Sequence, residues 1–433
     1  MRNSRLSAWL ERQPPQVFSA YCIAAAFGTY FCMYAFRKPF TAATFEEDAL
    51  LGVDYKTILI VSQLLGYTLS KFIGIRVVSE MSPRYRAVAI LALIGIAHVA
   101  LLIFAVVPAP YNFALMFLNG LPLGMVFGLV LGFLEGRRLT EMLTAGLCAS
   151  FIVSSGVVKS VGQFLLQGNY VSDYSMPFAA GLVFVIPLLV SVWLLAQIPP
   201  PGALDVEARS AREPIGAAER WSLFRWQALG LSALVLVYTL LTILRSLRDD
   251  FGVEIWAQLG SKGVPGIFAQ SETMVMFIVL LLNGSVFLVR DNRRAFLVSI
   301  MLVLGGFAGV LGSALAFQQG WLGGFAFMVT LGVGAYVPYV AFHTTVFERL
   351  IAVFRDRANL GYFMYLADSF GYLGYVFVLL LKNVLSAETD YLALMLNAAV
   401  GIALLSIALM LFATRYYFAR FREHSLELAP ERA

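Results

Sequence analysis

The sequence predicts an all-α integral membrane protein with twelve transmembrane helices arranged as two six-helix halves. Three observations support this prediction. Hydrophobic residues make up 60% of the 433 positions, charged residues make up only 13%, and apolar runs of about 20 residues recur along the whole chain. A soluble domain carries roughly twice that fraction of charged residues, so water is not the main solvent of this chain.

The apolar runs define the expected elements in order. A helix of about 20 residues spans roughly 30 Å of hydrocarbon, and every run is long enough to do so. The first run is too long, and too rich in tyrosine at its end, for a cleaved signal peptide. The twelve predicted spans cover residues 17–37, 57–75, 85–107, 111–134, 143–166, 176–197, 226–247, 267–289, 295–317, 321–347, 359–381 and 391–413.

One polar, proline-rich segment, PPPGALDVEARSAREPIGAAERW, separates six spans from six. Such composition is typical of a linker. We therefore expect an N-terminal six-helix half over residues 1–198, a cytoplasmic linker over 199–224 and a C-terminal six-helix half over 225–433. A two-half plan places a substrate near the middle of the membrane, between the halves, although a channel or a structural bundle is an alternative.

The net charge of +5 follows the predicted topology. Arginines gather before the first span, in the even-numbered loops and after the last span, which places both termini in the cytoplasm. The opposite loops hold little beyond Lys38, Lys56, Lys262 and Lys382. The basic charge therefore reports membrane orientation, and we expect no nucleic acid among the partners.

Covalent chemistry is not expected. Cys22, Cys32 and Cys148 all lie in apolar runs without metal-ligand spacing, so we predict no metal site and no disulfide framework. The sequence contains no Walker A loop, no GxSxG elbow and no HExxH motif. We expect neither an enzyme nor a cofactor.

Two arginines stand at the ends of the first and seventh spans, Arg37 and Arg245. A guanidinium near hydrocarbon costs at least a few kcal/mol and usually serves a function. Arginine also binds phosphate or carboxylate with two parallel hydrogen bonds. One such residue in each half predicts a central anion site.

Tyrosines share the faces of these arginines. Tyr30 and Tyr34 precede Arg37 at helical spacing, and Tyr238 precedes Arg245 by seven residues. An aromatic belt with a snorkelling Arg37 is the alternative. We expect the neighbouring Arg248 to pair with Asp249 and Asp250 in water at the membrane interface.

Four further polar side chains lie inside predicted spans. Lys71 and Lys159 would add positive charge to an anion-attracting cavity. Asp368 is expected to pair with one of the cations, with a proton carrier or a packing-level hydrogen bond as alternatives. His343 could titrate near neutral pH as part of the site, or serve as a structural hydrogen-bond donor.

These segments resemble the organophosphate:phosphate antiporters of the major facilitator superfamily, the glycerol-3-phosphate transporter-like family. The first-span pattern of that family matches Tyr30, Tyr34, Arg37, Lys38 and Phe40. Further matches are Ser70, Lys71, Phe72 and Ile73 in the second span, Arg245 with Asp250 in the seventh, Tyr336, Pro338 and His343 in the tenth, and Phe370 to Gly374 in the eleventh.

The resemblance implies a major facilitator fold, alternating access, and phosphate binding by Arg37, Arg245 and Lys71. Three segments depart from the family pattern. Lys159 stands where the family has a substrate-sensing histidine, and Gly124-Met125 is not followed by the family's prolines. Tyr238 precedes Arg245 by seven residues, where the family has three. These changes leave the identity of the substrate open.

The expected function is therefore secondary active transport of a small organic anion, preferably phosphorylated, across a bacterial inner membrane. A carboxylate or sugar-acid symporter and an anion-binding membrane sensor are the alternatives. The expected partners are the anion, the lipid bilayer and either phosphate or a proton as coupling ion, and the protein is expected to act as a monomer.

Overall fold

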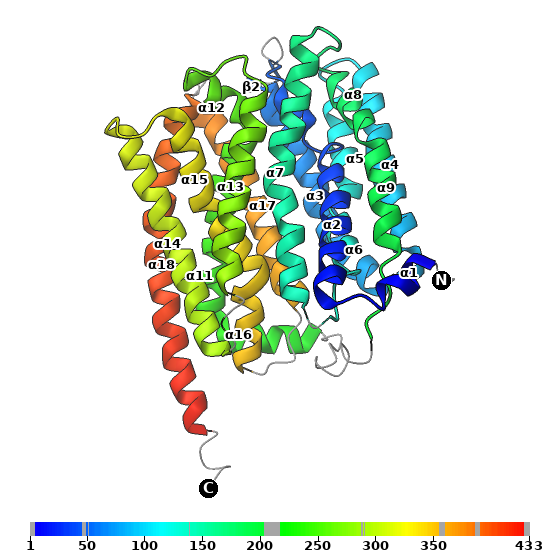
Figure 1. Cartoon of the computed structure of the whole chain (residues 1–433). Helices are drawn as coiled ribbons and strands as arrows, with labels where there is room; N and C mark the ends of the chain where they lie inside the picture. Colours follow the sequence, from blue (N-terminus) through cyan, green and yellow to red (C-terminus); the bar gives the residue numbers. More distant parts are fainter. Residues whose placement is uncertain are drawn as a thin grey trace.

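The computed structural model describes residues 5–45, 49–50, 52–137, 139–202, 217–286, 289, 291–354, 360–385 and 390–427. Long helices run side by side through the whole height of the molecule (Figure 1). Helix α1 (Arg5–Leu10) and the C-terminal end of α18 (Tyr391–Glu427) both lie toward the lower end in that view.

The helices follow the predicted spans. The first half contains α2 (Pro15–Tyr34), α3 (Tyr55–Glu80), α4 (Pro83–Val106), α5 (Phe113–Leu123), α6 (Val126–Leu131), α7 (Thr140–Gln167), α8 (Met176–Val183) and α9 (Val185–Ala196). The second half contains α11 (Ala217–Asp250), α12 (Gly252–Gln258), α13 (Gly266–Val286), α14 (Asn292–Gln318), α15 (Gly324–Ala341), the π-helical turn η2 (Phe342–Val346), α16 (Phe347–Phe354), α17 (Leu360–Leu385) and α18. A 3₁₀ turn, η1 (Pro39–Ala42), and a two-stranded hairpin of β1 (Ala49–Leu50) and β2 (Val53–Asp54) follow α2.

The predicted number of spans is confirmed. Among the described residues, 11 helices are long and apolar enough to cross a membrane, and the bent pair of α8 and α9 provides the twelfth span. Most of the predicted linker, residues 203–216, lies outside the described residues. Helix α11 begins at Ala217, eight positions before the predicted start of the second half, and bends at Gln227.

A proline explains where the sixth span is broken. A proline inside a helix lacks the backbone donor and clashes with the carbonyl four residues earlier. Pro187 stands four residues after Val183, where α8 gives way to α9 through a bend of 48°. In the tenth span Pro338 lies in α15, and the π turn η2 with His343 begins four residues later. Turns of this type often lie at functional sites.

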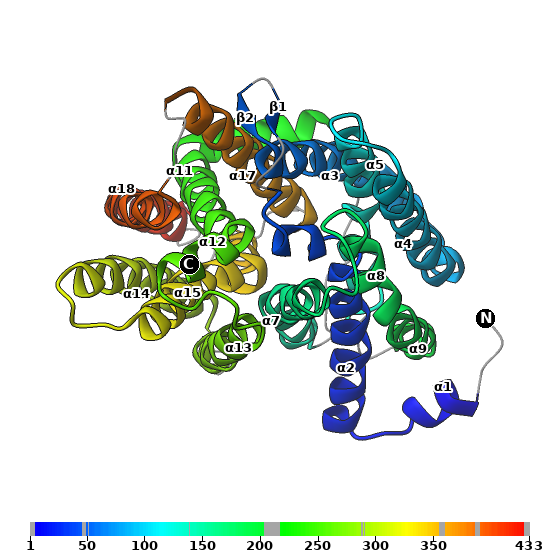
Figure 2. The ribbon, with the colours of Figure 1, turned by 90° about the horizontal axis from the view of Figure 1, so that it is seen from above.

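The two halves pack by the same plan. Helix α2 packs against α7 and α9, as α11 packs against α17 and α18. Helix α5 lies between α3 and α4, as α15 lies between α13 and α14. Two seams join the halves, one where α3 meets α17 and one where α7 meets α13 (Figure 2). Exchanging the halves converts each seam into the other, so the molecule has an approximate two-fold arrangement.

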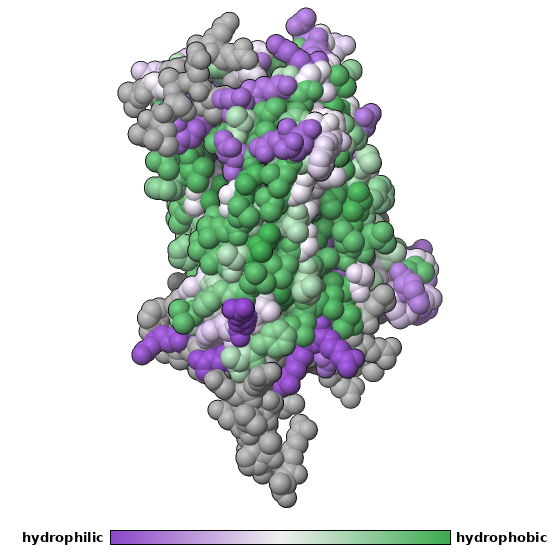
Figure 3. All heavy atoms as spheres, turned by 90° about the vertical axis from the view of Figure 1, so that its left-hand side faces the viewer, coloured by the Kyte–Doolittle hydropathy of each residue, from purple (hydrophilic) through white to green (hydrophobic). Residues whose placement is uncertain are grey.

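The outer surface suits a bilayer. On the face drawn in Figure 3, hydrophobic side chains form a band around the middle and polar side chains gather toward both ends. Large apolar residues such as Val106, Ile186 and Leu281 are more than two-thirds exposed. Lipid tails can cover such a band without cost, whereas water cannot.

Candidate functional site

Arg37 lies just beyond the end of α2, in the turn that leads to η1. Its side chain is buried, and the guanidinium carbon lies 3.8 Å from the centroid of the Tyr67 ring on α3. Gln63 fixes this turn, because its amide donates to the Arg37 carbonyl at 2.8 Å and to Asn119 Oδ1 at 2.7 Å. Within the described part of the chain, no carboxylate pairs with Arg37, and its Nε has no hydrogen-bond partner.

Arg245 repeats this arrangement in the second half. It lies on α11, is buried, and holds its guanidinium carbon 4.5 Å from the centroid of the Tyr339 ring on α15. Among the residues described, it too lacks a carboxylate partner, and its Nε is unsatisfied. Tyr34 and Tyr372 lie within electrostatic range of both guanidinium groups, so the two arginines face one tyrosine cluster from opposite halves.

A second group of polar residues lies beside the arginines. Lys71 Nζ on α3 lies 3.0 Å from Asp368 Oδ2 on α17. The Tyr238 hydroxyl on α11 donates to Asp368 Oδ1 at 2.5 Å and lies 3.5 Å from His343 Nε2. His343 Nδ1 lies 2.9 Å from the Tyr339 carbonyl oxygen, which requires a proton on Nδ1. The structure thus gathers Lys71, Tyr238, His343 and Asp368 into one network that crosses between the halves.

Tyr30 and Tyr34 lie at the wall of this region. Their rings meet edge to face with centroids 5.6 Å apart, and Tyr30 also packs against Phe127 at 5.3 Å. Both are buried. Their position beside Arg37 places phenol groups next to the guanidinium rather than in an interfacial belt.

The polar network lines a cavity of about 50 Å³. Such a volume holds a few water molecules and no organic anion. Its walls include Lys71, His343, Asp368, Tyr365 and Glu135. In this conformation the cavity is therefore too small for an organic anion, and neither Arg37 nor Arg245 is among its lining residues.

Lys159 lies in a different group. Its ammonium contacts Asp249 Oδ1 at 2.5 Å, and Ser155 donates to the same oxygen at 2.5 Å. Lys38 pairs with Asp249 Oδ2 at 2.9 Å and also with Asp250. We name these five residues, Lys38, Ser155, Lys159, Asp249 and Asp250, the lysine–aspartate cluster. It binds η1 and α7 of the first half to α11 of the second.

The expected pairing of Arg248 with Asp249 and Asp250 in water is wrong. Arg248 is buried and contacts Glu272 Oε1 on α13 at 2.7 Å and the Met328 carbonyl on α15 at 2.9 Å. The reason is that α11 continues to Asp250, so all three charges lie inside the bundle and point to different neighbours. Glu272 stood within the predicted eighth span, and this carboxylate in an apolar run was the signal that could have revealed the partner.

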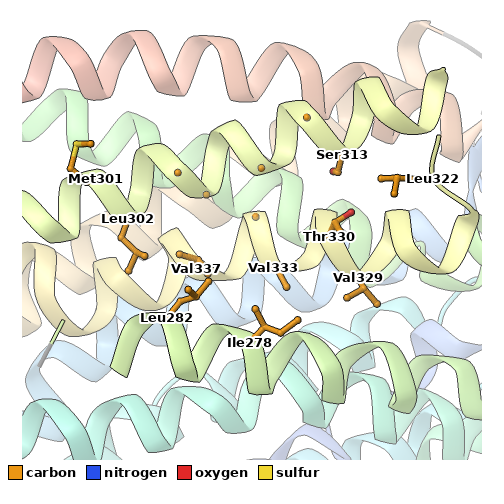
Figure 4. A pocket seen from close by; sticks show the side chains of 15 residues that line it. Ile278, Leu282, Met301, Leu302, Ser313, Leu322, Val329, Thr330, Val333 and Val337 are labelled. Atoms are coloured by element: carbon orange, nitrogen blue, oxygen red, sulfur yellow. The ribbon is translucent and has the colours of Figure 1, made fainter. Parts of the chain in front are cut away.

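A larger pocket of about 730 Å³ lies elsewhere, between α13, α14 and α15 (Figure 4). Its lining includes Ile278, Leu282, Met301 and Val333, with no charged side chain. Met301 is 67% exposed, which places the pocket on the outer, apolar face. Size alone therefore does not identify the anion site in this molecule.

The chain belongs to the family DUF5690, described as a family of unknown function, whose model matches residues 39–420. No curated protein matches the sequence.

Solved structures of membrane transporters share the fold. The nucleoside transporter NupG matches with a TM-score of 0.60 and 16% identity over 90% of this chain and 98% of its own. A D-xylose-proton symporter matches with a TM-score of 0.58 and 14% identity over 92% of this chain and 97% of its own. The human organic anion transporter MFSD10 matches with a TM-score of 0.53 and 15% identity over 92% of this chain and 100% of its own. The chain is thus an all-α integral membrane protein with the major facilitator fold.

Proposed function

We propose that this protein is a secondary active transporter that moves a small organic anion across the membrane by alternating access. One observation carries the proposal. Arg37 and Arg245, one from each half, are buried beside a shared tyrosine cluster and, in the described structure, neither has a carboxylate partner. An unpaired buried charge is costly, so a bound anion that pairs with both would stabilise this arrangement.

The charge balance of the centre supports an anionic substrate. Arg37, Arg245 and Lys71 supply three cations, and Asp368 supplies one carboxylate, which leaves two positive charges in excess. A phosphorylated metabolite fits this excess and the resemblance to the organophosphate:phosphate antiporters. A carboxylate such as a sugar acid is the second candidate, because a guanidinium binds carboxylate with the same paired geometry.

The fold supports movement of the halves. In the proposed cycle, residues 1–198 and 225–433 rock about the central site, joined by the linker at 199–224 on the cytoplasmic side. The structures with the same fold include a nucleoside transporter, a proton symporter and an organic anion transporter. We propose that the coupled substrate here binds between α2, α3, α11 and α17.

The test is a thermal-shift screen of purified protein against phosphorylated and carboxylated metabolites. We expect a subset of these anions to raise the melting temperature of the wild type. Arg37→Lys and Arg245→Lys should fold but show little ligand-induced stabilisation, because lysine cannot form the paired hydrogen bonds. Arg225→Lys is the matched control, since Arg225 is exposed near the start of α11. Near-wild-type stabilisation in either central variant would remove that arginine from the site.

A further inference from the structure

The carboxylate of Asp368 holds together the two halves at the centre of the molecule. Both oxygens are engaged, Oδ2 with the Lys71 ammonium at 3.0 Å and Oδ1 with the Tyr238 hydroxyl at 2.5 Å. Lys71 belongs to the first half, whereas Asp368 and Tyr238 belong to the second. All three side chains are buried, so the ion pair is shielded from bulk water.

Asp368 therefore competes with any substrate for Lys71. Apart from this carboxylate, the ammonium faces aromatic rings, with Tyr67 at 5.3 Å, Tyr365 at 5.4 Å and Phe127 at 5.7 Å from ring centroid to Nζ. An anion that binds Lys71 would leave Asp368 as a buried carboxylate without its cation, which is strongly unfavourable. Protonation of Asp368 removes that cost.

We infer that Asp368 is the proton-binding site that couples anion transport to a proton, with Lys71 alternating between Asp368 and the substrate. This inference rests on the proposed function and adds its coupling ion. The geometry favours a proton over exchange for phosphate, because the competing anion is a carboxylate of the protein, which a proton neutralises and a second anion does not.

The step balances in atoms and charge. A proton from water bonds to a carboxylate oxygen of Asp368, which becomes a neutral carboxyl group. The released Lys71 ammonium then pairs with an oxygen of the substrate anion. When the substrate leaves on the other side, Lys71 returns to Asp368 and the proton returns to water. One proton thus moves in the same direction as each anion.

The surroundings of Asp368 contain few groups that titrate near neutral pH. The charged and titratable side chains around it are Lys71 and Tyr67 on α3, Cys148 on α7, Tyr238 on α11, Tyr339 and His343 on α15 and η2, and Tyr365 and Tyr372 on α17. Free tyrosine and lysine titrate near pH 10, and free cysteine near pH 8.5. His343 is the competing candidate for the proton, so the test must separate the two.

The cavity beside the ion pair provides a path for the proton. Asp368, Lys71 and His343 line it together with Thr140, Thr144 and Glu135. Glu135 lies in the segment between α6 and α7, which the charge pattern predicts to be cytoplasmic. Water in this cavity can relay a proton between that segment and the Asp368 carboxylate.

Sulfate is a suitable probe, because it keeps its double negative charge across the relevant pH range. We expect the wild type to bind sulfate about tenfold or more tightly at about pH 5.5 than at about pH 7.5, since uptake of one proton changes affinity by up to about tenfold per pH unit. Asp368→Asn mimics the protonated carboxyl, so its sulfate affinity should match the low-pH wild type at both values.

Two control variants define the outcome. Glu254→Gln removes another ion pair between the halves, with Lys56 at 2.5 Å, and should keep the pH dependence. His343→Gln should keep it too, and its loss there would assign the proton to the histidine and overturn the inference. Equal pH dependence in wild type and Asp368→Asn, or none in the wild type, would also overturn it.

The failure of the proposed function is distinguishable. Loss of sulfate binding in Arg37→Lys supports the anion site whatever the effect of pH. If sulfate binds neither the wild type nor Asp368→Asn at either pH, the anion site itself is wrong, and the coupling role of Asp368 is rejected with it.

Discussion

A guanidinium group that lies over an aromatic ring is held in place without being neutralised. Arg37 lies 3.8 Å from the centroid of Tyr67, and the ring attracts the cation through its negative face. A carboxylate in the same place would cancel the charge and compete with the substrate. Tyrosine rings at the central site therefore orient positive charge while leaving it available to an anion.

Replacing the ring tests this role. Tyr67→Leu should weaken sulfate binding about tenfold, because a desolvated cation–π contact contributes about 1–2 kcal/mol to the placement of the guanidinium. Tyr67→Phe keeps the ring and should bind nearly as well as the wild type. The measurement is a sulfate titration followed by thermal shift.

The control for this prediction is a similar contact on the surface. Arg84 lies 4.6 Å from the Tyr85 ring centroid, and Tyr85 is 53% exposed. Tyr85→Leu should leave sulfate binding unchanged. An equal loss in Tyr67→Phe and Tyr67→Leu would show that the hydroxyl, and not the ring, holds the arginine.

At the residue scale, the sequence identified the charged side chains in apolar runs better than it identified their partners. A guanidinium or ammonium in an apolar run is visible from composition, and the structure buries Arg37, Arg245, Lys71 and Lys159. Which carboxylate each cation meets depends on how far two helices are rotated and shifted against each other. Lys159 and Asp249 are 90 positions apart, and no local pattern links them.

At the scale of elements, the lysine–aspartate cluster joins η1 and α7 to α11 through buried ion pairs. Asp249 serves both Lys38 and Lys159, so removing its charge leaves only Asp250 for two buried ammonium groups. Breaking a buried pair in this way costs about 3–5 kcal/mol. Asp249→Asn should therefore separate α7 from the C-terminal end of α11.

A cysteine at Gly252 can report the opening. A side chain there would meet only ordinary contacts, with Lys159 Nζ at 3.7 Å from the added Cβ, and Cys22, Cys32 and Cys148 are buried. We expect Gly252→Cys to react with a membrane-impermeant maleimide several-fold faster in the Asp249→Asn background. Asp291→Asn, which removes the charge of the carboxylate at the start of α14, is the control and should not change the rate. Unchanged labelling in Asp249→Asn would mean that the cluster does not close this end.

The elements themselves were predictable because length and apolarity alone define a membrane-spanning helix. The breaks within spans were less so. Pro187 marks one of them. The π turn at Phe342–Val346 comes after Pro338, and the periodicity of the sequence does not predict it.

At the scale of the whole molecule, the halves touch closely along α7 and α13. A Cβ at Gly156 would lie 2.5 Å from the Phe268 carbonyl oxygen and 2.6 Å from Glu272 Cγ. Only glycine allows this approach. Gly156→Leu should force the seam apart, because overpacking lowers the free energy of unfolding by about 1–3 kcal/mol. The melting temperature should fall, and sulfate binding should weaken.

Gly95→Leu is the matched control for that prediction. Gly95 lies on α4 and a Cβ there meets nothing within 4 Å. Both variants would be compared by thermal unfolding with and without sulfate. If Gly156→Leu behaves as Gly95→Leu does, the close contact of α7 with α13 is not needed for the central site.

The polar linker predicts two halves, but the sequence does not predict which helices form the seams. All twelve spans are apolar on several sides, so lipid-facing and seam-facing surfaces look alike in sequence. The pairing of α3 with α17 and of α7 with α13 follows from the three-dimensional arrangement alone.

The excess of positive charge at the centre has an electrical consequence. Moving one elementary charge through a membrane potential of about 100 mV involves about 2.3 kcal/mol. If Asp368 brings one proton with each anion, a monovalent substrate crosses without net charge movement and the potential neither helps nor hinders it. A divalent substrate carries one negative charge per cycle, and an interior-negative potential then opposes its uptake. The voltage across the membrane would thus distinguish substrates by valence, even where the binding residues accept both.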